Sequence, residues 1–388
     1  MRVALIGPVY PYRGGIAHYT ASLAEAFQQV GHEVLIYSFL RQYPYWLYPG
    51  KSDKEPSQQN IYFPVVYTID TMNPYTWVGT AKSIKEDHPD LVVFQWWTTF
   101  MSPAFTTIGY YCRQQQFPVV FLIHNVYPHE KRWLDRGLAW LTLRLGDAFI
   151  VQSDQEKNKL LSLLPNARVY LHPHPVYFPF AGLRLDNISA KTHLGLDTSL
   201  PVVLFFGIVR PYKGLSLLLE AIAVLKQRGY FIQVLVVGEF WEDINKYQQL
   251  IRKLEISDLV YLENRYIPNE EVPLYFSAAD IFVAPYISGT QSGAVKLAMG
   301  FGLPIVVSDI ICDDVLCNSD IVVKFPVRDT GQLAVAIQHA LEKKMRMDTS
   351  ISEDKGPTNN LWLDLAMLFQ KVLSDTSSLK NRGISESQ

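Results

Sequence analysis

The sequence predicts an α/β protein of two Rossmann-like domains, because short apolar runs alternate with amphipathic stretches along nearly the whole chain. Apolar runs without polar alternation are typical of parallel strands that are buried on both faces. A length of 388 residues also suits about two domains of ordinary size. We therefore expect two domains that face each other across a cleft, lined by the carboxyl ends of their strands.

The apolar runs fall into two groups, one in each half of the chain. The first group is RVALIG, EVLIYSF, LVVFQWW, VVFLIHN and AFIVQS, and the second is VVLFFG, QVLVVG, LVYLEN, IFVAPY and PIVVSD. Helical patterns lie between these runs. In GIAHYTASLAEAFQQVG, for example, Ile16, Tyr19, Leu23 and Phe27 share one face, and Gly31 stands where the helix should end.

A proline-rich stretch between the two groups, LHPHPVYFPFAGLRLDNISA, lacks helical periodicity and predicts a linker. We expect an N-terminal domain over residues 1–175, the linker over 176–195 and a C-terminal domain over 196–350. After a polar break, an apolar pattern predicts a helix over 358–374 that packs back on the N-terminal domain. The Ser-, Lys- and Glu-rich residues 375–388 predict a flexible tail.

Composition and charge argue against several classes of protein. A formal net charge of −2 disfavours a general nucleic-acid binder. The three cysteines at 112, 312 and 317 fit neither a disulfide framework nor paired zinc ligands, and indicate buried thiols in a reducing compartment. The N-terminus lacks the pattern of a signal peptide, and no run reaches the ~20 apolar residues of a membrane span. We expect a soluble cytoplasmic protein.

Glycines follow the first apolar run. Ligands bind beyond the carboxyl ends of parallel strands, so the residues after each run are the candidates for a site. Gly14 and Gly15 open a helix, whose amides and dipole favour an anion. The segment matches neither the G-x-G-x-x-G dinucleotide pattern nor a Walker A loop, which disfavours nicotinamide and NTPase chemistry. A plain strand-to-helix turn is the alternative.

Polar side chains follow the run VVFLI. His124 and Asn125 come directly after it, and His129 and Glu130 lie a few residues on. A histidine at a strand end can hydrogen-bond a hydroxyl or carbonyl group near a reacting centre. A purely structural histidine is the alternative.

Two cations lie in the turn FFGIVRPYKG, and this is the strongest signal in the sequence. Arg210 and Lys213 precede an amphipathic helix, where positive charge works against the helix dipole. A bound anion would explain them, and a planar fork beside a compact charge suits a diphosphate. Such side chains can take the place of a metal ion in stabilising a leaving diphosphate. The chain contains no Asp-x-Asp pair that would ligate a divalent metal ion. A solvated surface pair is the alternative.

Further candidates follow the next strands of the second group. Glu239 follows QVLVVG, while Arg265, Tyr266 and Ile267 follow LVYLEN, so these positions can flank a nucleotide base. From Tyr286 to Val307 the only charged side chain belongs to Lys296, so a ligand there must be held by amides, hydroxyls, one amide side chain and one cation.

These motifs together resemble the family 4 (group 1) glycosyltransferases of the GT-B fold. The similarity covers roughly residues 1 to 330. It is carried by GPVYPYRGGIAHYTASLAEAF, FQWWT, HNVYPHE, DAFIVQS, RPYKG, NRYIPNEEVPLYFSAAD, PYISGTQSG and GFGLPIVVSD. The resemblance implies a retaining, metal-independent transfer of a sugar from a nucleotide-diphosphate donor, without a cofactor, to a glycan or lipid-linked acceptor. It also implies a role in bacterial polysaccharide or envelope glycan synthesis.

The resemblance assigns roles to several of these residues. Arg210 and Lys213 match the basic pair on the donor diphosphate, Gly15 the glycine whose amide approaches the phosphate, and His124 the histidine near the transferred sugar. Glu239 and Tyr266–Ile267 match positions around the nucleotide.

One motif departs from the family pattern. The Glu-x7-Glu motif, whose acids contact the sugar and the ribose, is replaced by Gly289 and Leu297. The TQSG motif resembles that of a subgroup in which a loop replaces the two acids. The implied contacts are backbone amides of Gln291, Ser292 and Gly293, the Gln291 side chain, and Lys296 on a phosphate.

The acceptor side contains many aromatic residues. QYPYWLYPG (42–50), Trp96 and Trp97 suit stacking on sugar rings or shallow contact with the inner face of a membrane, and packing within the domain is the alternative. The acceptor-side candidates are Tyr10, Arg13, Trp96, Trp97, Asn125, His129 and Glu130. Two other functions stay open: a nucleotide-sugar epimerase or hydrolase of the same fold, and a non-catalytic binding subunit.

Overall fold

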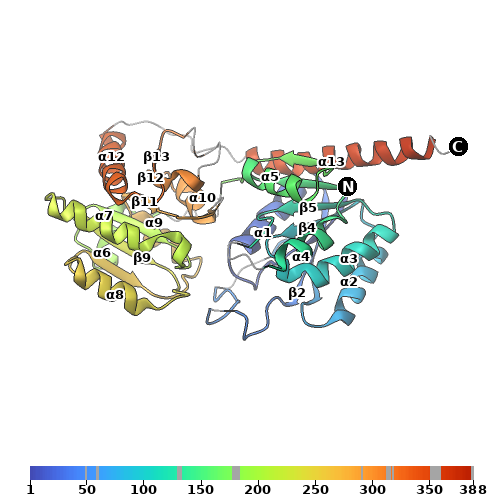
Figure 1. Cartoon of the computed structure of the whole chain (residues 1–388), viewed down its shortest axis with the longest axis horizontal. Helices are drawn as coiled ribbons and strands as arrows, with labels where there is room; N and C mark the ends of the chain where they lie inside the picture. Colours follow the sequence, from blue (N-terminus) through green and yellow to red (C-terminus); the bar gives the residue numbers. More distant parts are fainter. Residues whose placement is uncertain are drawn as a thin grey trace. The chain divides into compact units, whose positions relative to one another are not determined.

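The computed structural model describes residues 1–48, 50–57, 61–128, 133–176, 184–289, 292–311, 316, 319–349 and 360–385. The predicted site residues His129, Glu130 and Gln291 lie outside these ranges, as do Cys312 and Cys317. The chain divides into two compact units. The first unit is Met1–His174 with Asn359–Gln388, and the second is Pro175–Thr358 (Figure 1).

The described strands of the first unit form one parallel sheet in the order β3-β2-β1-β4-β5-β6-β7. They are β1 (Arg2–Ile6), β2 (Glu33–Arg41), β3 (Val65–Asp70), β4 (Leu91–Trp96), β5 (Val119–Ile123), β6 (Ala148–Val151) and β7 (Val169–Leu171). The strand order reverses between β1 and β4. In open α/β sheets such a reversal opens a crevice at the carboxyl ends of the strands, where ligands bind.

Helices cover both faces of this sheet. They are α1 (Gly15–Gln29), α2 (Pro74–Asp87), η1 (Thr99–Met101), α3 (Ser102–Gln114), α4 (Asp135–Leu143), α5 (Asp154–Leu163) and α13 (Asn360–Ser385). Local signals explain their starts. The Asn73 side chain accepts a hydrogen bond from the Tyr75 amide at the start of α2, and Ser153 caps α5 through the Glu156 amide.

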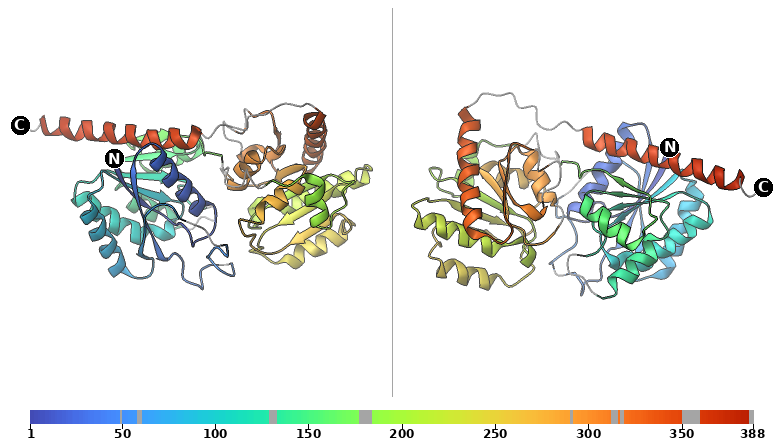
Figure 2. Two further views of the ribbon diagram at one scale, coloured as in Figure 1. Left: turned by 180° about the vertical axis from the view of Figure 1, so that it is seen from behind. Right: turned by 45° about the horizontal axis from the view of Figure 1, so that its top comes forward.

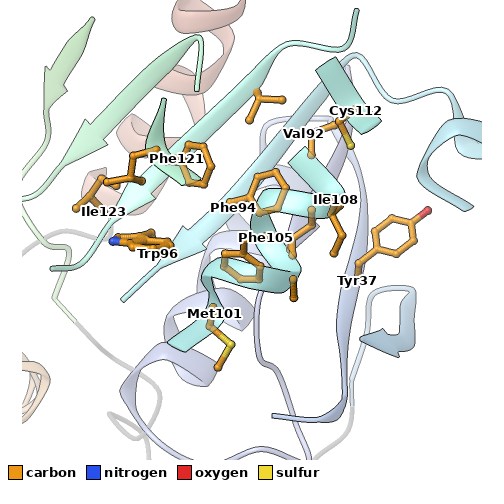
Figure 3. Close-up of a cluster of buried hydrophobic side chains, with 14 of the residues drawn as sticks. Tyr37, Val92, Phe94, Trp96, Met101, Phe105, Ile108, Cys112, Phe121 and Ile123 are labelled. Carbon is orange, nitrogen blue, oxygen red and sulfur yellow. The ribbon is translucent and has the colours of Figure 1, made fainter. Parts of the chain in front are cut away.

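The core of the first unit is aromatic. Strands β4 and β5 are buried along their whole length, and Phe94, Phe105 and Phe121 pack ring against ring between β4, β5 and α3 (Figure 3). Cys112 lies in the same cluster as a buried free thiol, which confirms its prediction.

The last helix packs on the first one. Phe369 of α13 contacts Phe27 of α1 with 5.3 Å between ring centroids, and α13 runs along the first unit in both views of Figure 2. Helix α13 continues to Ser385, so the segment 375–385 of the predicted tail is helical. Asp375 fixes this part of the helix: its carboxylate accepts a hydrogen bond from the Tyr170 hydroxyl (2.7 Å) and its carbonyl one from Arg168 (3.1 Å).

The second unit has the same type of architecture as the first. Its described strands form a parallel sheet in the order β10-β9-β8-β11-β12-β13, which reverses between β8 and β11. The strands are β8 (Val202–Phe206), β9 (Gln233–Val237), β10 (Val260–Glu263), β11 (Ile281–Ala284), β12 (Ile305–Ser308) and β13 (Val322–Phe325). The helices are α6 (Asn187–His193), η3 (Pro211–Lys213), α7 (Leu215–Gln227), α8 (Ile244–Lys253), α9 (Val272–Ala278), α10 (Gly293–Gly300), η4 (Asp309–Ile311) and α12 (Thr330–Thr349).

Part of the predicted linker is helical. Residues Asn187–His193 form α6, and the Asp186 carboxylate caps it by accepting a hydrogen bond from the Ser189 amide. Lys191 on this helix donates to the Asp280 carboxylate (2.7 Å), so α6 is part of the second unit. The two-domain α/β class is confirmed.

Candidate active site

The crevice of the second unit is built from tightly packed backbone. Gly207, Gly238 and Gly214 all adopt positive φ, at 105°, 139° and 71°. A Cβ at Gly238 would lie 2.2 Å from the Gly207 carbonyl oxygen, and one at Gly214 would lie 2.0 Å from that of Pro285. The loops after β8, β9 and β11 therefore meet where only glycine fits.

The predicted cations lie in the loop that joins β8 to α7. Lys213 ends the short helix η3 immediately before α7, and its ammonium lies 3.1 Å from the point that a Cβ on Gly207 would occupy. Arg210 precedes η3, and its guanidinium lies over the rings of Trp241 (5.4 Å) and Tyr212 (5.7 Å). Contacts of a guanidinium with aromatic faces are electrostatically favourable.

Lys213 is half-buried, which disfavours the alternative of a solvated surface pair for this residue. Burial lowers the pKa of Lys213; Tyr212 opposes this shift and the nearby Arg210 charge adds to it. The ammonium also lies 5.5 Å from the centre of the Tyr286 ring. No carboxylate of the described residues acts on its pKa. A desolvated cation beside a second cation favours a bound anion.

The loop after β11 leads into the start of α10. The Ser292 hydroxyl accepts a hydrogen bond from the Val295 amide (3.3 Å) and lies 2.9 Å from the Tyr286 hydroxyl. This side chain is therefore committed to capping, and Gly293 begins the helix. Lys296 is fully buried on α10. Gly289 and Leu297 contribute no carboxylate here, and Leu297 packs against the apolar core of the unit.

The remaining candidates of the second unit differ in role. Glu239 is buried directly after β9, and its carboxylate accepts a hydrogen bond from the Trp241 indole (3.3 Å). Arg265 donates to Glu263 (2.9 Å), to Glu271 and to the Tyr275 hydroxyl (2.9 Å). This network holds the loop after β10, so Arg265 is a positioning residue. Ile267 is buried in the core behind that loop, and Tyr266 is half-buried.

The crevice of the first unit contains the predicted glycines. Gly14 is the N-cap of α1 with φ at 102°, and Gly15 is the exposed first residue of the helix. A Cβ on either would meet nothing within 4 Å, so space lies in front of the helix start. The first turn has no acidic residue and no side-chain cap. This arrangement is suited to an anion.

His124 belongs to a buried polar cluster. Its ring nitrogen Nε2 hydrogen-bonds the Gln95 amide oxygen, and its ring meets Tyr19 edge-on at 4.7 Å. The Tyr19 hydroxyl accepts a hydrogen bond from Gln152 (2.6 Å), and His174 packs on the same tyrosine. Burial, helped by His174, lowers the pKa of His124 to about 3. The imidazole is therefore neutral at neutral pH; a hydrogen bond with Gln152 opposes the lowering of its pKa without reversing it.

We expect this burial to make the stability of the chain depend on pH. Between the folded pKa of about 3 and an unfolded pKa of about 6.5, the unfolded chain binds the proton and the folded chain does not. The contribution is therefore complete above about pH 6.5 and is lost as the pH falls. In His124→Gln, the loss on acidification should be smaller by about 1.4 kcal/mol per pH unit.

Urea unfolding at pH 7 and pH 5 measures this difference. The exposed His193 supplies a control, since His193→Gln removes an imidazole outside the buried cluster. An unchanged slope in His124→Gln would show that this histidine is protonated in the folded protein.

The acceptor-side predictions fare unevenly. The prediction that Trp96 contacts the acceptor is wrong, because its side chain is fully buried among Phe105, Phe121 and Ile123 (Figure 3). Its indole donates a hydrogen bond to the Val126 carbonyl (3.2 Å). Trp97 is half-buried after β4, and Asn125 is half-buried after His124. The carbonyl of the half-buried Tyr10 accepts a hydrogen bond from Tyr67.

Sequence reasoning missed the polar neighbours of His124, and it singled out QYPYWLYPG without identifying the contacts that its tyrosines make with Arg13 and Trp97. Gln95 and Gln152 each stand at or after the end of a strand, which is the available signal for the first set. The Arg13 side chain donates to the Tyr48 hydroxyl (3.2 Å), and the Trp97 indole donates to that of Tyr43 (2.9 Å). Both tyrosines come from QYPYWLYPG.

Two family models match the chain. "Glycosyltransferase Family 4" matches residues 13–177, and "Glycosyl transferases group 1" matches residues 200–343. A comparison with curated protein sequences finds no match. In the described part of the chain, no group of three or more His, Cys, Asp or Glu side chains is placed to hold a metal ion. Nor does any helix there have the length and hydropathy to cross a membrane.

Solved structures share the fold at low sequence identity. A glycosyltransferase from Rickettsia africae superposes with a TM-score of 0.69 at 16% identity, covering 96% of this chain and 98% of that chain. Sucrose-phosphate synthase from Thermosynechococcus elongatus gives 0.68 at 19%, covering 96% and 99%. HepE from Anabaena gives 0.64 in complex with UDP and 0.63 with UDP-glucose, at 14% identity and full coverage of both chains.

Proposed function

The chain belongs to the family 4 (group 1) glycosyltransferases and has their two-domain GT-B fold, and on this premise we propose that it moves a sugar from a nucleotide-diphosphate donor to a glycan or lipid-linked acceptor. The proposed reaction retains the configuration at the transferred carbon, needs no cofactor and no divalent metal, and belongs to bacterial polysaccharide or envelope glycan synthesis. The retaining course and the biological role rest on the family resemblance.

One observation carries the proposal: in the loop after β8, at the strand reversal of the second unit, Lys213 lies against the Gly207 backbone and Arg210 lies over the Tyr212 and Trp241 rings. When the glycosidic bond of the donor breaks, negative charge develops on the leaving diphosphate. The half-buried Lys213 ammonium and the Arg210 guanidinium are positioned to meet that charge. Pre-positioned charge of this kind is commonly worth several kcal/mol of transition-state stabilisation. These two side chains supply positive charge without a metal ion.

The buried His124 contributes differently. Because its imidazole is neutral and held by Gln95, it can orient a hydroxyl of the transferred sugar and cannot repel the cationic character that develops on the sugar ring. We propose the helix start at Gly14 and Gly15 as an anion site of the first unit. The UDP and UDP-glucose complexes of HepE make uridine diphosphate the first nucleotide to test.

The absence of the paired glutamates favours one competing function, a binding subunit that no longer catalyses. Gly289 and Leu297 stand at those positions, so no acid there contacts the sugar or the ribose. A nucleotide-sugar epimerase or hydrolase is a weaker competitor, since the carboxylate of Glu239, the strand-end acid nearest β9, already accepts a hydrogen bond from the Trp241 indole. Acceptor-dependent release of the nucleoside diphosphate separates transfer from both competitors.

A thermal-shift screen against UDP-, GDP-, ADP-, dTDP- and CMP-sugars, each with and without EDTA, tests the donor proposal. A ligand present at a hundred times its dissociation constant should stabilise the fold by about 2.7 kcal/mol. We expect one nucleotide class to raise the melting temperature equally in both conditions. A shift that EDTA abolishes and Mg²⁺ restores would contradict metal independence, and no shift with any donor would favour the binding subunit.

A further inference from the structure

Glu156, in the first turn of α5, is a buried acid to which the proposed reaction gives no role. The residue is only 1% exposed. Acidic side chains are almost never this buried unless they are paired and hydrogen-bonded, because burial of the charge costs free energy. The partners of this carboxylate therefore indicate what it does.

Both oxygens of the Glu156 carboxylate accept hydrogen bonds. Oε2 accepts one from the Val126 amide (2.6 Å), and Oε1 accepts one from the Lys159 ammonium (2.7 Å). Hydrogen bonds to a charged acceptor are short and about twice as strong as those between neutral groups. The Lys159 side chain is 30% exposed, so the ion pair reaches solvent, whereas the hydrogen bond to Val126 is buried.

The sequence around Glu156 offers the acid a nearer partner. Ser153 is the N-cap of α5, and its side chain accepts a hydrogen bond from the Glu156 amide. The spacing S-x-x-E is that of a capping box, in which the acid returns to the amide of the N-cap residue. Glu156 instead reaches Val126, 30 residues earlier in the chain. Its side chain therefore ties the loop after β5 to the start of α5.

The turn His124–Val126 is fixed at both of its ends. The His124 amide donates to the Trp96 carbonyl (2.8 Å), and the Val126 carbonyl accepts from the Trp96 indole (3.2 Å). The hydrogen bond to Glu156 completes the backbone contacts of Val126, which is fully buried. The connection between β6 and α5 also supplies Gln152, whose side chain hydrogen-bonds that of His124. This connection therefore contacts the turn through both Gln152 and Glu156.

We propose that Glu156 is a positioning residue for sugar transfer, because its carboxylate fixes the turn that carries His124 at the carboxyl end of β5. This inference rests on the proposed transferase function. A displacement of about 1 Å near a reacting centre can lower a rate about 10²-fold, so a side chain that orients the sugar needs a fixed backbone. The carboxylate acts through Val126 and not on the substrate.

Glu156→Ala tests the inference, since it takes this acceptor away from the Val126 amide. We expect the ¹³C–¹H signal of the His124 ring, assigned by its loss in His124→Gln, to shift or broaden. With UDP-glucose as the donor and water as the acceptor, kcat for UDP release should fall at least about tenfold. KM should stay close to that of the parent chain, because Arg210 and Lys213, the proposed diphosphate contacts, belong to the second unit.

Three further variants separate positioning from a loss of charge or of folding. Glu156→Gln keeps an oxygen that can accept from the Val126 amide, so it should restore both the His124 signal and the rate. Lys159→Ala removes only the ion pair and should behave like the parent chain. If Glu156→Ala does not fold, Glu156→Asp takes its place, because it withdraws the carboxylate by one methylene and keeps the charge.

The outcomes separate this inference from the proposed function. An unchanged His124 signal in Glu156→Ala would overturn the positioning role, and so would an unchanged kcat or an equal loss in Lys159→Ala. A parent chain that turns over no nucleotide sugar would reject the transferase function. The His124 signal alone would then decide whether Glu156 fixes the turn.

Discussion

Lys213→Ala should lower the rate of sugar transfer by about 10²–10³-fold, the loss typical when one pre-positioned group on developing charge is removed. The ammonium lies against the Gly207 backbone at the strand reversal, where a leaving diphosphate would meet it. The melting temperature should change little, because removing a desolvated cation beside Arg210 relieves repulsion and breaks no ion pair of the described residues. Initial rates of nucleoside diphosphate release, with acceptor present, measure the effect.

Lys226→Ala is the matched control. Lys226 lies in the last turn of α7, whereas Lys213 precedes its first turn, and it pairs with Asp258 (2.7 Å) on the surface. Its loss should leave the rate intact and cost at most about 1 kcal/mol of stability. Full activity in Lys213→Ala, accompanied by a large drop in melting temperature, would make this lysine structural.

Gly214→Ala should disrupt the same site through the backbone. Gly214 adopts φ of 71°, which costs a residue with a Cβ about 1–2 kcal/mol. Its Cβ would also lie 2.0 Å from the Pro285 carbonyl oxygen, so the loops after β8 and β11 must separate. Overpacking of this kind typically adds about 1–3 kcal/mol. We expect a large loss of unfolding free energy in urea and, because η3 moves, a loss of transfer activity.

Gly195→Ala isolates the effect of the clash. Gly195 has nearly the same φ, 68°, and a Cβ there would meet nothing within 4 Å. This variant should show only the backbone strain and keep its activity. Equal destabilisation of the two variants would mean that the contact between Gly214 and Pro285 gives way easily.

The fold could be predicted well because its strands are buried on both faces. Each predicted apolar run contains a strand, and the helix expected from Gly15 onward is present. Three strands were missed for physical reasons. β3 is mostly half-exposed, β7 has only three residues, and β13 includes an exposed lysine. None of these three segments therefore has the continuous apolar sequence that predicts a buried strand. The end of α13 was missed because its partners, Arg168 and Tyr170, are about 200 residues away in sequence.

The candidate site was less predictable. Strand ends reveal which residues lie at the crevice, and Arg210, Lys213, Gly14 and His124 are found there. Strand ends do not reveal which side chains turn inward. Trp96 is the last residue of β4 and is fully buried, whereas Trp97 lies beyond the end of the strand and is half-buried, although both rings contact Phe105. The sequence also does not indicate that the side chains of Ser292 and Arg265 form local hydrogen bonds.

The central claim is that Arg210 and Lys213 hold the diphosphate of a sugar donor without a metal ion. Calorimetric titration of UDP into the parent chain and into Lys213→Ala, both in EDTA, tests it most directly. We expect the parent chain to bind UDP in EDTA and the variant to bind at least tenfold more weakly, a difference of about 1.4 kcal/mol. Equal affinities, or binding by the parent chain only after Mg²⁺ is added, would contradict the claim.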